Sequence, residues 1–112
     1  MDRKELVRKY KETPRPAGNW RVRHIASGRS LVGSSPDAPA MLNRIRAQLR
    51  LKAHRNRALQ RDWDEGGADA FELEVLDLLP PPETPDQDIA EDLKVLEAMW
   101  VEKLGLTEET RY

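Results

Sequence analysis

The side chains best suited to chemistry in this chain form a dense run of cations in its middle. Such groups can follow a phosphate backbone, because each one neutralises a phosphate and releases a counterion. The alternative is a solvated helix face whose cations pair with acidic residues elsewhere in the chain. The density of the run favours binding. We call it the basic tract, and it consists of Arg44, Arg46, Arg50, Lys52, Arg55, Arg57 and Arg61.

Few other side chains offer catalysis. The chain has no cysteine and two histidines, His24 and His54. The lack of cysteine excludes a thiolate nucleophile, a disulfide scaffold and any zinc site with a cysteine ligand. Two histidines alone argue against a structural zinc site. We expect His54 to occupy a loop or a helix cap rather than to bind a metal.

Charge is divided unevenly along the 112 residues, a length that allows one compact domain. Residues 1–61 hold 16 Lys and Arg and 4 Asp and Glu, a net charge of +12, whereas residues 62–112 hold 3 and 16, a net charge of −13. A basic half suggests a phosphate-bearing partner, although the two halves can also neutralise each other. The chain shows no signal-peptide pattern and no apolar run near the roughly 20 residues that span a bilayer, so we expect no membrane contact and a cytoplasmic location.

The first half of the chain predicts a helix and a β-hairpin. Residues 2–12 are typical of a short charged helix, and the prolines of a linker at 13–16 end it. Residues 18–25 alternate in polarity as a half-buried strand does, and a second short strand is expected at 29–33. A turn with glycine separates the two segments, which predicts the hairpin.

Residues 40–104 predict three helices and one strand. Residues 40–52 carry apolar side chains at helical spacing, and a second helix follows a break at 53–55. Residues 70–79 alternate as a strand does, and a proline-rich connector leads from it to a last helix at 89–104. This order fits a three-stranded sheet covered by helices, either an α+β fold or an α/β sandwich.

The hairpin resembles that of the GIY-YIG nuclease family. That family carries Gly-Ile-Tyr on its first strand and Tyr-Ile-Gly on its second. The corresponding tripeptides here are Gly18-Asn19-Trp20 and Leu31-Val32-Gly33, with eleven residues from Trp20 to Leu31. We expect Trp20 to pack against the sheet, the alternative being that it stacks on a base or a sugar.

The resemblance continues through the last helix. Segments 54–63 and 71–76 resemble the family's second helix and third strand. Glu97-Ala98-Met99-Trp100 resembles its final-helix motif, a glutamate ahead of an aromatic residue. The resemblance implies an α+β fold, a three-stranded antiparallel sheet flanked by helices. It divides the chain into an extra N-terminal helix and linker at 1–16, the GIY-YIG-like domain at 17–105 and a tail at 106–112.

The resemblance also implies roles for single positions. In the family, the first tyrosine acts as general base or positions the attacking water, the second supports it, and an arginine stabilises the phosphate. These three positions fall on Trp20, Leu31 and Met41 here. A glutamate that binds a divalent metal, usually magnesium, corresponds to Glu97. The family's later asparagine has no counterpart after Glu97.

These substitutions remove proton transfer from the motif positions. An indole N–H donates and cannot accept a proton, and Leu31 has no polar side-chain atom. Loss of a general base costs on the order of 10²–10⁴ in rate. Three side chains can substitute: Arg44, one helical turn beyond Met41, His24, on the same strand face as Trp20, and Tyr10.

Three hypotheses follow. The first is a GIY-YIG-fold protein that binds nucleic acid, with DNA favoured, and whose phosphodiester hydrolysis is impaired or absent. The second is an active metal-dependent endonuclease with a rearranged site that uses Glu97, Arg44 and His24. The third is a non-enzymatic interaction module that uses its acidic half or forms a homodimer through the last helix.

Overall fold

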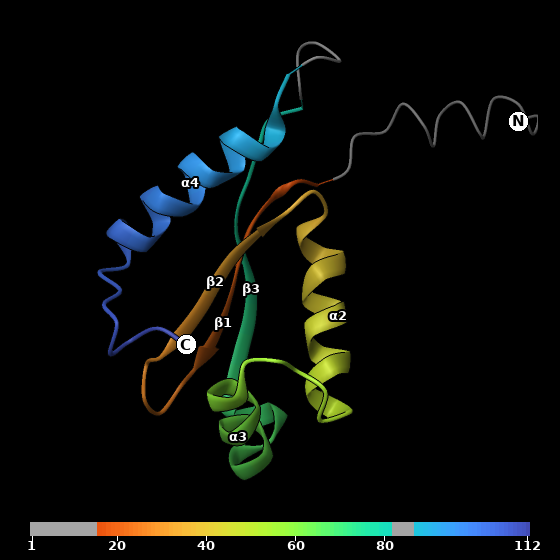
Figure 1. Ribbon diagram of the computed structural model, residues 1–112, viewed down its shortest axis with the longest axis vertical. Coiled ribbons are helices and arrows are strands. Elements are labelled where there is room, and N and C mark those ends of the chain that lie inside the picture. The colour runs from red at the N-terminus through yellow and green to blue at the C-terminus, as the bar shows by residue number, and fades with distance from the viewer. Residues whose placement is uncertain (1–15, 82–86) are drawn as a thin grey trace, which may run out of the picture.

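The computed structural model describes residues 16–81 and 87–112 (Figure 1). A three-stranded antiparallel sheet in the order β2–β1–β3 stands at its centre. Helices α2 and α3 pack on one face, and α4 lies on the other (Figure 1). The elements are β1 (Gly18–His24), β2 (Ser30–Ser35), α2 (Ala38–Arg50), α3 (Arg57–Gly66), the short 3₁₀ turn η1 (Ala68–Ala70), β3 (Phe71–Leu78) and α4 (Ile89–Lys103). The α+β fold with three helix-flanked strands is confirmed.

The hairpin forms as the alternation predicts. Trp20 pairs with Gly33 and Val22 with Leu31, so all four face α2. Gly28 makes the turn at φ +76°, a conformation that favours glycine. The second strand continues to Ser35, two residues beyond the expected end.

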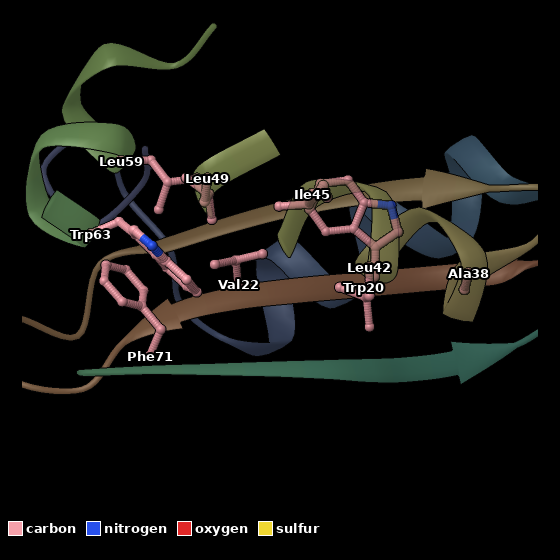
Figure 2. Close-up of a cluster of buried hydrophobic side chains, with 9 residues drawn as sticks. All are labelled: Trp20, Val22, Ala38, Leu42, Ile45, Leu49, Leu59, Trp63 and Phe71. Carbon is pink, nitrogen blue, oxygen red and sulfur yellow. The ribbon is translucent and has the colours of Figure 1, made fainter. Parts of the chain in front are cut away.

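The core lies between the sheet and helices α2 and α3 (Figure 2). The side chains of α2 that the periodicity selected, Leu42, Ile45 and Leu49, are all buried there. Trp63 joins them from α3. The cluster consists of Trp20, Val22, Ala38, Leu42, Ile45, Leu49, Leu59, Trp63 and Phe71.

Polar caps set the helix boundaries. Asp37 accepts a hydrogen bond from the Ala40 amide (3.1 Å), so α2 begins at Ala38, two residues before the expected start. Asn56 likewise accepts from the Leu59 amide (3.2 Å) and starts α3 at Arg57. The expected helix at 2–12, with Tyr10, lies outside the described residues.

Helix α4 is more exposed than its apolar spacing suggests. Leu93 is its only buried residue. The sequence makes Trp100 a core candidate, but its indole is half-buried and donates to Asp77 (3.3 Å). The described residues add no further layer over α4. Met99 is 60% exposed. No helix among the described residues is long and apolar enough to cross a bilayer.

The C-terminal tail packs against the hairpin. The Ser30 amide donates to the Thr110 carbonyl (2.9 Å), and the Tyr112 amide donates to the Ser30 carbonyl (3.0 Å). The Tyr112 hydroxyl donates to Asp62 (2.6 Å), and the Arg29 guanidinium lies 4.5 Å from the centre of its ring. The tail therefore closes part of the open edge of β2.

Candidate functional site

The three substituted motif positions lie together. Trp20, Leu31 and Met41 line one pocket of about 730 Å³, which runs beside α2 on the core face of the sheet. The pocket gathers residues from β1, β2, α2 and the loop that joins α2 to α3. The rest of its lining is Arg44, Ile45, Gln48, Ala53, His54, Arg55 and Asn56.

Trp20 forms a packed wall of this pocket. The side chain is 7% exposed, and its ring lies against Gly33, where a Cβ would stand 2.3 Å from the indole Cζ2. The glycine therefore makes room for the ring. The indole Nε1 is buried and has no hydrogen-bond partner among residues 16–81 and 87–112. This burial agrees with the expected packing of Trp20 against the sheet.

Arg44 lies one helical turn beyond Met41, the position that corresponds to the motif arginine. Met41 is half-buried and packs against the core, whereas Arg44 is exposed and lines the same pocket. Within the described residues Arg44 makes no ion pair. Its guanidinium is thus available to an anion at the pocket.

The loop after α2 brings His54 to the pocket. Lys52, at φ +59°, turns the chain out of the helix. The His54 amide donates to the Gln60 side chain (3.1 Å), and the Asn56 amide donates to His54 Nδ1 (3.1 Å). Burial, followed by the neighbouring Arg55 cation, lowers the pKa of His54. The ring is therefore held neutral, with its proton on Nε2.

Sequence reasoning placed His54 in a loop but gave it no part in a site. The loop position is correct, and the pocket lining is the additional finding. The one signal for it was its place within the basic tract. Whether a loop residue reaches a pocket depends on the path of the loop, which periodicity does not reveal.

His24 lies away from the pocket. It shares the face of Trp20, as strand alternation requires, but four residues farther along β1, about 13 Å at the rise of a strand. Its Nδ1 lies 2.7 Å from the Ser27 hydroxyl, and its ring lies 4.9 Å from that of Phe71. The structure does not bring His24 together with the motif positions.

Glu97 lies on the other face of the sheet. It extends from α4 and accepts a hydrogen bond from the Ser34 hydroxyl (2.9 Å). Asn19, fully buried beside them, donates to the same hydroxyl (2.7 Å). Glu97 thus contacts the hairpin, but it does not line the pocket of Trp20.

The residues around Glu97 offer few ligands for a metal ion. Its second carboxylate oxygen has no partner among the described residues. No group of three or more metal-ligating side chains occurs in the described chain. Magnesium is commonly held by one or two carboxylates together with water and phosphate oxygens. The donor set therefore fits magnesium bound through one carboxylate, and it does not fit a cage built from protein alone.

The basic tract has no ion-pair partner in the part of the chain that the structure describes. Its residues extend from α2 through the loop to α3, and most are exposed. None of the seven makes an ion pair in residues 16–81 and 87–112. The ion pairs among the described residues involve other cations. They join Arg21 to Glu74, Arg23 to Glu72 and Arg29 to Asp62. Two of these three pairs join β1 to β3 across the sheet.

Two solved structures share this fold. The catalytic domain of the homing endonuclease I-TevI aligns with a TM-score of 0.67 and 21% identity, over 86% of this chain and 95% of that domain. A mutant of the catalytic domain of the intron endonuclease I-TevI aligns with a TM-score of 0.66 and 20% identity, over 86% and 90%. The chain thus has the GIY-YIG fold that its motifs suggested. The sequence matches no family model and no curated protein.

Proposed function

We propose that this GIY-YIG-fold protein binds nucleic acid through the basic tract, and that phosphodiester hydrolysis at the adjacent pocket is impaired or absent. The observation that carries the proposal is the pocket itself. It unites the three motif positions and fills them with Trp20, Leu31 and Met41. The unpaired tract beside it supplies the attraction for phosphates. An endonuclease domain of the same fold supports nucleic acid as the ligand class.

Hydrolysis of a phosphodiester needs groups that these positions lack. Neither an indole nor an isobutyl side chain accepts a proton, so the attacking water has no base at Trp20 or Leu31. Met41 offers no charge to the phosphate, and the absence of such a charge weakens transition-state stabilisation. Together these changes favour binding without turnover.

Magnesium remains part of the proposal through Glu97. Its carboxylate can hold one hydrated ion, which when bound polarises a phosphoryl oxygen. The protein's own contribution is to orient that carboxylate by the hydrogen bond from Ser34 (2.9 Å). Glu97→Gln should therefore weaken any magnesium-dependent increase in nucleic-acid affinity, with no effect on affinity measured in EDTA.

A binding titration with a plasmid assay tests the main proposal. Fluorescence anisotropy with labelled DNA should show affinity that falls steeply as salt rises, because phosphate contacts release counterions. Plasmid incubated with magnesium should stay uncut. Binding that ignores salt would contradict the proposal, and RNA run in parallel establishes the preferred nucleic acid.

An active endonuclease with a rearranged site is the second candidate. The observation in its favour is that Arg44 and His54 share the pocket, so a cation and a neutral imidazole meet there. Plasmid nicking by the wild type that disappears in Glu97→Ala would establish this candidate.

A triple variant, Trp20→Tyr, Leu31→Tyr and Met41→Arg, shows whether the scaffold accepts restored groups. Cleavage by that variant alone would confirm a disabled site.

Self-association through α4 is the third candidate. Val95 is 55% exposed and Met99 60% exposed on the outer side of this helix. Size-exclusion chromatography with light scattering distinguishes it, since a homodimer that binds no nucleic acid would replace the main proposal. Val95→Asp should then yield a monomer.

A further inference from the structure

We propose that the pocket beside α2 holds one unpaired nucleotide, so that the protein prefers single strands and frayed ends to intact duplex. The inference rests on the proposed function and specifies its ligand. At its three motif positions the pocket offers apolar side chains, none of which transfers a proton.

The floor of the pocket suits a base. Leu31 and Met41 present apolar side chains where hydroxyl and guanidinium groups are expected from the motif, and Ile45 and Trp20 complete the wall. A nucleobase is a flat body with apolar faces, and its burial against such side chains is favourable. A site for a backbone phosphate alone has no need of this surface.

The rim suits the polar parts of a nucleotide. Arg44 and Arg55 supply cations, and Gln48 and Asn56 supply amides. The Asn56 side-chain oxygen caps α3, but its NH₂ has no partner in the described chain, and the Gln48 amide is also free there. Amide groups can pair with the edge of a base, and guanidinium groups with its phosphate. No carboxylate of the described residues lines the pocket, so none of them repels an anion there.

The size of the pocket limits the occupant. Its volume of about 730 Å³ lies within the range of sites for small organic molecules. A stacked and paired base cannot present its faces to these walls, and extrusion from a duplex carries an energetic cost. A base that is already unpaired avoids this cost. The same pocket should therefore bind a free mononucleotide.

Competition against labelled oligonucleotides tests the inference. Adenosine 5′-monophosphate should displace a short labelled single strand, whereas adenosine or inorganic phosphate alone should do so poorly. We expect the single strand to bind at least about tenfold tighter than the duplex of the same sequence, which reflects the cost of unpairing. Equal affinity for the two forms, or displacement by phosphate as effective as by the nucleotide, would overturn the inference.

Variants separate the pocket from the basic tract. Leu31→Trp fills the pocket and should abolish nucleotide binding and the preference for single strands, with duplex affinity kept. Leu51→Trp adds the same bulk at a residue 77% exposed outside the pocket and should behave as wild type. Gln48→Ala empties rather than fills the site. It should weaken nucleotide binding several-fold in a folded protein, and unchanged binding would count against the inference even if Leu31→Trp fails to fold.

The two proposals fail in different ways. Nucleic-acid binding without nucleotide binding or strand preference would overturn the pocket inference and leave the proposed function standing. Nucleotide binding without any binding of longer nucleic acid would overturn the proposed function instead. Arg57→Ala with Arg61→Ala gives the matching control, because both residues belong to the tract and neither lines the pocket. This variant should weaken both nucleic-acid forms alike and leave nucleotide binding unchanged.

Discussion

Trp20 and Glu97 approach neighbouring residues of β2 from opposite faces of the sheet. The indole lies against Gly33, and the Glu97 carboxylate accepts a hydrogen bond from the hydroxyl of Ser34 (2.9 Å). Because successive residues of a strand face opposite ways, the sheet itself separates the substituted position from the one acidic motif residue that remains. The wall of the pocket and the candidate metal ligand thus depend on the same short stretch of β2.

Gly33→Ala should disrupt the wall of the pocket. A Cβ there would stand 2.3 Å from the indole Cζ2, and the rigid ring can yield only by displacing its neighbours in the core. We expect a loss of about 1–3 kcal/mol in the free energy of unfolding, as for other overpacked sites. Urea denaturation of the variant and the wild type measures it.

A double-mutant cycle tests the cause of that loss. Trp20→Phe removes the part of the ring that meets the new methyl group. The loss caused by Gly33→Ala should therefore be smaller in the Trp20→Phe background. Additive effects of the two substitutions would show that Gly33 matters for another reason, such as strand geometry.

The salt dependence of binding should show how many cations of the basic tract contact phosphates. Arg57→Ala and Arg61→Ala each remove one exposed cation that has no ion-pair partner in the described chain. On duplex DNA, the slope of log affinity against log salt should become shallower by about 0.9 for each phosphate that the variant no longer neutralises. Anisotropy titrations at several salt concentrations measure the slope.

A control on α4 makes that result specific. Lys94 is an exposed cation of α4, on the other face of the sheet from the tract. Lys94→Ala should leave the slope unchanged. An equal change in the two kinds of variant would indicate attraction to overall charge instead of contact with the tract.

The sequence determined the elements of this fold better than their surroundings. The spacing of Leu42, Ile45 and Leu49 predicted both a helix and its buried face, because an amphipathic helix must bury one side. The same argument placed Trp100 in the core. It is half-buried because no other described element covers α4. Local periodicity predicts which face of a helix is apolar, but not whether another layer packs on that face.

The sequence identified three residues of the candidate site, but not which other residues line the same pocket. Trp20, Leu31 and Met41 were assigned through the resemblance to the GIY-YIG motif, and they line one pocket. His24 was a candidate base because of strand alternation, which fixes the face of a side chain but not its distance along the strand. His54 reaches the rim through a loop held by Gln60, a contact between segments that no local pattern encodes.

Protonation of His54 should weaken the fold as the pH falls. Burial, aided by Arg55, lowers the pKa of His54, so the folded protein binds this proton more weakly than the unfolded chain. The stability that neutral His54 contributes is fully present above about pH 6.5, the pKa of a free histidine. It is lost as the pH falls toward the lowered pKa of the folded state. Urea denaturation across this range measures the loss.

A variant isolates the histidine from other titrating groups. His54→Asn retains an oxygen that can accept from the Asn56 amide but cannot be protonated. As the pH falls, the free energy of unfolding of the wild type should decrease more than that of His54→Asn. Parallel pH profiles for the two proteins would show that His54 titrates alike in the folded and unfolded states.

The C-terminal tyrosine should stabilise the domain through a single charged hydrogen bond. The Tyr112 hydroxyl donates to Asp62 (2.6 Å) and links the tail to α3. Burial, followed by this hydrogen bond and the charge of Asp62, raises the pKa of Tyr112. Tyr112→Phe should therefore cost about 1–3 kcal/mol of unfolding free energy, since the partly buried Asp62 carboxylate loses its hydrogen bond and keeps only the longer contact to Arg29 (4.0 Å). Glu108→Ala, at an exposed residue of the same tail, should change stability by less than about 0.5 kcal/mol. Equal losses in these two variants would mean that the tail acts as a whole and that the hydrogen bond to Asp62 adds nothing of its own.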